Sequence, residues 1–478
     1  MTRETIKSIV IAVLFGLIIV LLRSLWMDDS VLTREEKLSS STQIRDDVAY
    51  LLEPKAVNVS FGRSKMTTFF FDKEDIFDAF KPSIAEGIKQ RLTESPISTD
   101  RYYEERKFKS VEFVLPSKFP TDLLLTLLTN EETVYTGKIE FVEKLMFISR
   151  TSDRFYIYDG DNYFEVITKT TIYDSIDFVD QIEKDKSNSV YKTVSERFYL
   201  KNNNESSSFR SRKNEVLIPE GKLESLVPIK VVNEIDASQS IEIQSLAKNV
   251  FGSRLNFVQE VIDVNGAIVL LYGYGDKALK VTPDGSLEYS EKIDYQKNYR
   301  RDFLLNLNVA LDTIEKLGSK SERIYLSKVT KLRQGNADGF GFEFEYRIDN
   351  TKVIDLKGFS GVKADVYGEQ ISSFTRNIKN YYTKLSYNRN TEIDPFYSMI
   401  DKKENFNLFY ENFKNDSGYG YLDLTREQIN DMVLKAISDF YMAYVLNEDN
   451  ELVPAYAITF GDRVYYIDYF TNRVLESY

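Results

Sequence analysis

Hydrophobic and polar positions divide the chain into one continuous apolar run near its start and a long remainder in which the two kinds alternate. The run Ile9–Leu22 holds 14 apolar residues, and Arg23 and Ser24 separate it from Leu25-Trp26-Met27. Residues 9–27 are therefore close in length to the ~20 residues that a helix needs to cross a bilayer core. Twelve Ile, Val, Leu and Phe side chains favour insertion by more than Arg23 opposes it. We expect a transmembrane helix over 9–27.

The charges beside this run predict its orientation. Arg3 and Lys7 precede it, while Asp28 and Asp29 follow it. Because positive charge stays inside, we expect a single-pass protein of the cell membrane with residues 1–8 as a cytoplasmic tail and the bulk on the outer face. A cleaved signal peptide is the alternative, but no small-x-small site directly follows the apolar core.

Three residues of the predicted helix are candidate contacts with a partner's membrane helix: Gly16, Arg23 and Trp26. Small and polar residues mediate helix contacts in lipid, which favours this interpretation. Ordinary anchor composition explains the same residues, and both interpretations stay open.

Beyond a polar stalk over 28–47, helical spacing and strict alternation follow one another along the chain. This pattern predicts an α+β fold in which helices pack on antiparallel sheets. We expect helices over 73–92, 120–128, 240–251, 301–317 and 425–445. We expect strands over 57–61, 67–71, 110–115, 139–142, 145–149, 154–158, 163–169, 255–263, 267–274, 278–282, 340–346, 452–460, 464–468 and 474–477.

Two of these segments carry further expectations. The helix over 425–445 opens with the capping box Thr425-Arg-Glu-Gln428. The strand over 340–346 places four aromatic side chains on one face, and it places Glu343 and Glu345 on the other, which we expect to be solvated. A helix followed by antiparallel strands occurs around 301–378 and again around 425–478, so we expect a repeated helix-plus-meander unit.

The low-complexity stretch over 201–211 is rich in Asn and Ser and predicts a linker or insertion. It divides the exterior part into a domain over 48–200, a linker over 201–215, a middle domain over 216–390 and a C-terminal domain over 391–478. Each domain is expected to be α+β.

The composition excludes several classes of chemistry. The chain has no His and no Cys, which removes His-dependent triads, thiolate nucleophiles and the usual zinc sites. A formal net charge of −12 argues against a nucleic-acid surface. We therefore expect no enzyme, no catalytic residue, no cofactor and no metal site.

Four short motifs resemble functional sites, but each has a simpler explanation. The S-x-x-K pattern at Ser245–Lys248 recurs at 189–192 and 360–363 without the companion motifs of penicillin-binding enzymes, so we attribute it to chance. Asp159-Gly-Asp-Asn162 fits a hairpin turn better than a calcium loop. Gly273-Tyr-Gly275 lacks the third glycine of a dinucleotide loop. Glu343 and Glu345 suit a solvated strand face better than an acid–base pair.

The order of several motifs resembles the YycH family of low-GC Gram-positive bacteria. These motifs are Thr-Arg-Glu-Thr-Ile-Lys-Ser-Ile9 before the anchor and Leu25-Trp26 at its end, Val111-Glu-Phe-Val-Leu-Pro116 with Phe119-Pro120, Val216-Leu-Ile-Pro-Glu220, Val281-Thr-Pro-Asp-Gly-Ser-Leu-Glu-Tyr289, Leu452-Val-Pro-Ala-Tyr456 and Val464-Tyr-Tyr-Ile-Asp-Tyr469. The last two resemble the family's C-terminal hairpin, which is similar to a PepSY module. The stretch over 201–211 and Arg23 depart from the pattern.

The resemblance implies an accessory protein of an essential sensor histidine kinase of the YycG/WalK kind, which governs cell-wall metabolism. It also implies a second accessory partner of related fold, similar to YycI. Two alternatives stay open: an exterior scaffold of the wall-synthesis apparatus, and a wall hydrolase that uses paired carboxylates.

Overall fold

The computed structural model of the protein describes residues 48–63, 65–70, 73–169, 175–185, 191–199, 214–220, 226–299, 301–318, 324–385, 405, 407–411, 432–461 and 463–477. These residues belong to a compact unit that runs from Arg45 to Tyr478. Helices and antiparallel-rich sheets make up this unit, so the predicted α+β class is confirmed.

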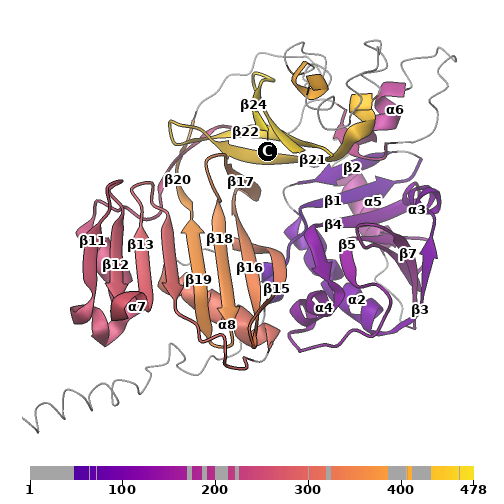
Figure 1. The fold of residues 1–478 in the computed structure, drawn as a ribbon. Coiled ribbons are helices and arrows are strands. Elements are labelled where there is room, and N and C mark those ends of the chain that lie inside the picture. The colour runs from indigo at the N-terminus through magenta and orange to yellow at the C-terminus, as the bar shows by residue number, and fades with distance from the viewer. Residues whose placement is uncertain are drawn as a thin grey trace, which may run out of the picture. The chain divides into compact units, whose positions relative to one another are not determined.

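The first sheet has the strand order β3-β7-β6-β5-β4-β1-β2-β8-β9, and neighbouring strands are antiparallel (Figure 1). Its strands are β1 (Ala56–Phe61), β2 (Met66–Phe69), β3 (Arg91–Ile97), β4 (Lys109–Pro120), β5 (Phe141–Ile148), β6 (Arg154–Tyr158), β7 (Tyr163–Thr168), β8 (Tyr191–Thr193) and β9 (Leu217–Pro219). The two strands predicted over 139–142 and 145–149 form one strand, β5. It stays paired with β4 along its length, because β4 resumes its pairing at Phe119 and Val142 after a shift in register.

Helices cover both faces of the first sheet. They are η1 (Ala49–Leu51), α2 (Glu74–Lys89), α3 (Thr99–Arg106), α4 (Thr121–Thr129), α5 (Ser175–Asp185) and α6 (Val194–Tyr199). The apolar positions of α2 at helical spacing, among them Phe77 and Phe80, pack against Phe113 of β4. On the opposite face, Tyr102 of α3 packs with Met146 and Tyr156. Alternate residues of β4 and β5 therefore point to two different environments.

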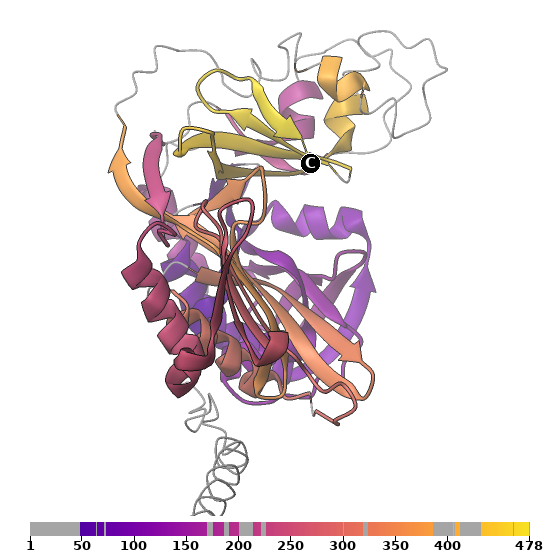
Figure 2. The ribbon, with the colours of Figure 1, turned by 60° about the vertical axis from the view of Figure 1, so that its left-hand side comes forward.

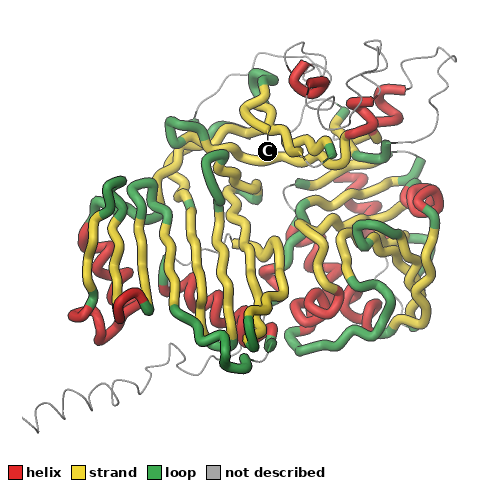
Figure 3. Tube along the Cα trace, in the orientation of Figure 1, coloured by secondary structure: helices red, strands yellow, loops and turns green. Residues whose placement is uncertain are grey.

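The second sheet contains the remaining strands of the described residues, from β10 to β24 (Figure 3). They are β10 (Ile229–Asn233), β11 (Gln259–Ile262), β12 (Ile268–Tyr272), β13 (Lys277–Val281), β14 (Leu287–Glu291), β15 (Ile324–Gln334), β16 (Ala337–Ile348), β17 (Thr351–Asp355), β18 (Gly361–Tyr367), β19 (Gln370–Asn377), β20 (Lys379–Lys384), β21 (Ile437–Leu446), β22 (Glu451–Phe460), β23 (Arg463–Asp468) and β24 (Val474–Ser477). Only β17 and β21 pair in parallel among these described strands.

Among the described residues, the two long helices α7 (Ser240–Phe251) and α8 (Phe303–Lys316) are each followed by an antiparallel meander of this sheet. Helix α7 and the short η2 (Gly252–Phe257) precede β11 to β14, with η3 (Gly273–Gly275) between β12 and β13. Helix α8 precedes β15, β16, β18 and β19. The two helices contact each other, and α8 packs on the sheet (Figures 1 and 2). The pairing of β14 with β19 joins the two units.

The predicted helix over 425–445 is wrong over most of its described part. Residues 432–436 are helical, but Ile437–Leu446 form β21, which pairs with β22 along its length and with β17 in parallel. The segment is rich in β-branched and aromatic residues, namely Ile437, Phe440, Tyr441, Tyr444 and Val445, and this composition suits a strand between two others. The capping box lies outside the described residues. Helix-plus-meander units lie at 240–291 and 303–377, and at 432–477 the helical residues 432–436 precede the antiparallel strands β21 to β24.

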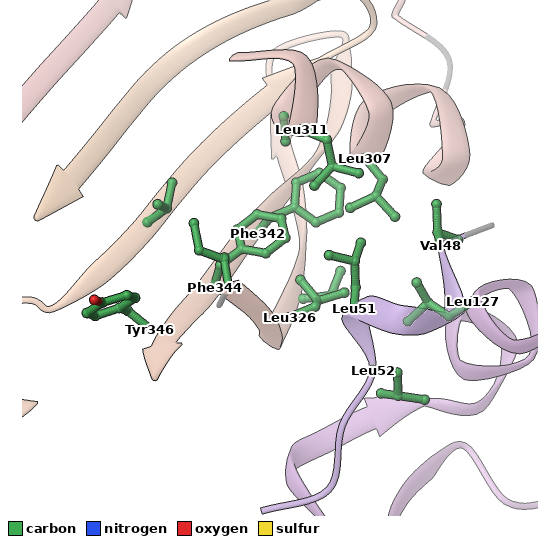
Figure 4. Packing of buried hydrophobic residues seen from close by; sticks show 14 of the residues in the cluster. Val48, Leu51, Leu52, Leu127, Leu307, Leu311, Leu326, Phe342, Phe344 and Tyr346 are labelled. Atoms are coloured by element: carbon green, nitrogen blue, oxygen red, sulfur yellow. The ribbon is translucent and has the colours of Figure 1, made fainter. Parts of the chain in front are cut away.

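One hydrophobic core runs through both sheets. Val48 and Leu51, at the start of the described chain, belong to the same buried cluster as Leu307 of α8 and Phe342 of β16 (Figure 4). Phe340, Phe342, Phe344 and Tyr346 are all at most 2% exposed, so the predicted aromatic face of this strand is confirmed.

No helix among the described residues is long and apolar enough to cross a membrane. The tail, anchor and stalk predicted over 1–47 lie outside the described residues, as do Gly16, Arg23 and Trp26. The predicted domain boundaries stay predictions. Strand β9 belongs to the first sheet although it follows the predicted linker, and β21 to β24 extend the sheet that the middle segment begins.

Candidate functional site

Buried charges gather where the first sheet meets the second. Glu53 precedes β1, Lys73 precedes α2, and Glu345 and Arg347 lie on β16. The ammonium of Lys73 is 3.3 Å from Glu53 Oε1 and donates to the carbonyl of Phe70 at 2.8 Å. The guanidinium of Arg347 pairs with Glu53 and donates from Nε to Glu345 Oε1 at 2.6 Å. We call these four residues the buried ion network.

Burial and mutual charge set the protonation of this network. Burial, with the positive charge of Arg347, lowers the pKa of Lys73 to about 8, and burial raises the pKa of Glu53. Burial opposes ionisation of Glu345, but Arg347 and Lys352 outweigh it and lower its pKa to about 2. The side chains of Glu53 and Arg347 are each 2% exposed, so each charge depends on its partner.

The position of Glu345 corrects the expected solvated strand face. Its side chain is 6% exposed, whereas that of Glu343 is 32% exposed and pairs with Lys328 and Lys363. The segment before β1 covers this face of β16 at Glu345. Glu53 of that segment and Glu345 both pair with Arg347. The two glutamates have different partners, and this argues against an acid–base pair.

A second group of charges lines a pocket of about 350 Å³, which we call the polar cleft. Its walls come from β1, β4 and β5 on the α3 face of the first sheet and from residues 214–217 and 435–441. An adjoining pocket of about 190 Å³ shares Lys55, Phe70, Asp439 and Tyr441 with it and reaches Lys73, Glu345 and Arg347. The buried ion network therefore borders the same polar space.

Glu112 of β4 is the most enclosed carboxylate of the polar cleft. It accepts hydrogen bonds from Tyr102 Oη and Asn58 Nδ2, both at 2.6 Å, and lies 3.6 Å from Arg106 Nη1. Burial opposes its ionisation, but Arg106, Lys144 and the two hydrogen bonds together lower the pKa of Glu112. Arg106 also donates to the carbonyl of Glu215 at 2.8 Å, so it links α3 to the residues that precede β9.

Across the cleft, Lys55 Nζ and Asp439 Oδ2 are 2.6 Å apart. Burial opposes ionisation of Asp439, and Lys55 and then Lys144 overcome this and lower its pKa. Lys144 of β5 lines the cleft and places its ammonium 5.3 Å from the centre of the Tyr158 ring. No carboxylate in the described part of the chain forms an ion pair or hydrogen bond with Lys144.

The motifs singled out in the sequence do not meet in a site. Ser245 and Lys248 lie exposed on α7, and Lys363 is exposed on β18. Asp159 Oδ1 accepts from the backbone N–H groups of Asp161 and Asn162, which is the predicted turn. Gly273–Gly275 form the short helix η3 between two strands.

Sequence reasoning missed the polar cleft because its charges come from segments far apart in the chain. One sign was present: Glu112 interrupts the apolar strand Val111–Leu115, and the neighbouring charges Glu143 and Lys144 interrupt β5. A single charge inside an otherwise apolar strand must find a partner when the sheet is covered on both faces.

No family model and no curated protein matches the chain. Among solved structures, an uncharacterized protein from Eubacterium rectale ATCC 33656 is similar at 10% identity and a TM-score of 0.33, over 52% of this chain and 85% of that chain. A likeness at this level carries no argument about function. The class that the structure defines is an α+β protein with two antiparallel-rich sheets.

Proposed function

We propose that this chain is a non-enzymatic, membrane-anchored regulator of a sensor histidine kinase that controls cell-wall metabolism. It acts through contacts of its membrane helix and of its exterior part, together with a YycI-like partner. The predicted anchor over 9–27, the resemblance to the YycH family and the absence of His and Cys support this proposal.

The observation that carries the protein-binding part is the exposed edge of the second sheet. Strand β11 pairs with β12 alone among the described strands, and all four of its residues are exposed. Ile262 is 67% exposed, and the flanking Phe257 and Val264 are 69% and 100% exposed. An open edge with apolar side chains is a template onto which another chain can add a strand. The occupant that we propose is a strand of the kinase's exterior domain.

Regulation through such a contact requires a difference in affinity. The protein changes the output of the kinase only if it binds the two signalling states with different free energies. A tenfold difference corresponds to about 1.4 kcal/mol, which the loss or gain of a few apolar contacts at the edge can supply.

The test compares Ile262→Lys with Val134→Lys in cells that lack the native protein. Val134 is 86% exposed in the loop after α4, so the control also exchanges an exposed apolar side chain for lysine. We expect Ile262→Lys to change transcription controlled by the kinase as deletion does, and Val134→Lys to restore the native level. Deletion without any change in kinase output contradicts the proposal and favours the scaffold alternative.

A further inference from the structure

The polar cleft carries an excess of positive charge in an acidic protein. Four cationic side chains line it, namely Lys55, Arg106, Lys144 and Lys435, against the three carboxylates Glu112, Glu215 and Asp439. The chain as a whole has a formal net charge of −12. A local excess of the opposite sign in a concave, partly enclosed space focuses an attractive field on anions.

Among the cleft residues that the structure describes, Arg106 and Lys55 are held by ion pairs, whereas Lys144 is not. Arg106 pairs with Glu112 and with Glu215, the latter at 3.3 Å, and Lys55 pairs with Asp439 at 2.6 Å. Lys144 has the ring of Tyr158 beside it, and the charge of Glu112 acts on it without forming an ion pair in the described part of the chain. Because an ammonium that is partly removed from water gains most from an anion, this position fits a carboxylate or phosphate group.

The other groups that line the cleft suit a ligand whose uncharged part is rich in hydroxyl groups. Tyr103 Oη and Tyr163 Oη are 3.1 Å apart at the cleft, and Thr99 and Ser438 add further hydroxyls to its lining. Flat tyrosine rings beside polar groups offer an apolar surface together with donors and acceptors. A volume of about 350 Å³ lies at the lower end of the range for small-molecule sites.

We propose that the polar cleft binds a small polyhydroxylated anion, a sugar acid or a sugar phosphate, whose charged group contacts Lys144. The site uses no residue of β11, so it is independent of the kinase contact proposed above. A protein can hold this ligand whether or not it regulates a kinase.

The experiment is calorimetric titration of the full-length protein in detergent at low salt with three probes that share one ring: glucuronate, glucose 6-phosphate and glucose. We expect saturable binding of at least one of the two anions and binding of glucose at least tenfold weaker. Which anion binds more tightly identifies the sugar acid or the sugar phosphate as the natural class. Absence of saturable binding by both anions, or equal binding of glucose, overturns the proposal.

Lysine variants test whether Lys144 is the residue that contacts the anionic group of the ligand. Lys144→Gln is expected to weaken anion binding at least tenfold, and Lys144→Arg, which keeps the charge, to stay within a few-fold of the native protein. The matched control is Lys230→Gln, because Lys230 is an exposed strand lysine on β10. Equal binding by Lys144→Gln and Lys230→Gln overturns the assignment.

A variant with an effect of opposite sign separates binding from misfolding. Asp439→Asn removes the carboxylate that holds Lys55 and increases the positive charge of the cleft. It should tighten anion binding several-fold, which a damaged fold cannot do. Weaker binding by a variant whose circular dichroism spectrum matches that of the native protein contradicts the proposed charge recognition.

Discussion

At the scale of single residues, the molecule depends on charges that are buried and matched. Glu112, Glu345 and Arg347 lie on strands whose neighbouring positions are apolar, and each is at most 6% exposed. A buried ion pair contributes little to the free energy of unfolding, but removal of one partner lowers this free energy strongly because the other charge stays buried alone. Their effects on stability are therefore large and specific.

Replacement of Glu112 by Gln should destabilise the protein by about 3 kcal/mol. The variant keeps the shape of the side chain but removes the charge beside the buried Arg106, and it weakens the hydrogen bond from Tyr102. Denaturant unfolding of the purified protein measures the change. Glu288→Gln is the control, because its pair with Lys280 is half-exposed and should be worth less than about 1 kcal/mol. Equal effects of the two variants would contradict this account of burial.

Glu345 should give the protein a specific sensitivity to acid. Its pKa of about 2 in the folded state lies below the ordinary value of 4.5, so the unfolded chain binds more protons between these limits. The free energy of unfolding therefore falls as the pH decreases through this window, by about 3 kcal/mol from this group.

The difference between variants isolates this contribution. Glu345→Gln should lose less stability than the native protein between about pH 5 and pH 2. Glu343→Gln, on the same strand but partly exposed, should follow the native curve. Parallel curves for the native protein and Glu345→Gln would show that the charge of Glu345 is not held by its neighbours.

At the scale of elements, the local sequence pattern predicts the bounds of a helix or strand correctly when tertiary packing favours the same structure. Helix α7 lies over the predicted residues 240–251, and the strands β6 and β24 also have their predicted bounds. The alternation of Phe340 to Tyr346 identified a buried face because all four side chains meet the same core. The turn at 159–162 was predictable since Asp159 accepts bonds from its own loop.

The features that the sequence did not predict depend on contacts between segments far apart in the chain. Residues 437–446 form a strand because β17 and β22 take up their backbone groups on both sides, and neither partner is visible from the segment itself. Glu345 was expected to be solvated since the segment that covers it, around Glu53, is far away in the sequence and pairs with the same Arg347. The polar cleft combines β4, β5 and the start of β21 in the same way.

Gly361 illustrates a position where an element tolerates no side chain. Its φ is +123°, and a Cβ atom there would lie 2.2 Å from the carbonyl oxygen of Phe344 on the neighbouring strand β16. Gly361→Ala should therefore lower the free energy of unfolding by roughly 2 kcal/mol or more. In Gly358→Ala the new methyl group meets no atom within 4 Å, so thermal unfolding should change little. Similar melting temperatures for both variants would contradict the close approach of β18 to β16.

At the scale of the whole molecule, one hydrophobic core connects the described part of the chain. Leu51 near its start, Phe113 of the first sheet and Phe344 of the second belong to the same buried cluster. The predicted division into domains rests on composition, whereas packing joins the segments on both sides of the predicted linker. A continuous core of this kind is suited to holding the edge strand β11, the proposed binding edge, in a fixed position.

We propose that the protein binds a sensor histidine kinase through the predicted membrane helix over 9–27 and through the part of the chain that follows it. The most direct measurement is a pull-down from membranes with the full-length chain, beside a chain in which residues 9–27 are replaced by an unrelated anchor helix. We expect the native chain to recover a histidine kinase and the replaced helix to weaken this recovery. Failure of both chains to recover any histidine kinase would contradict the account.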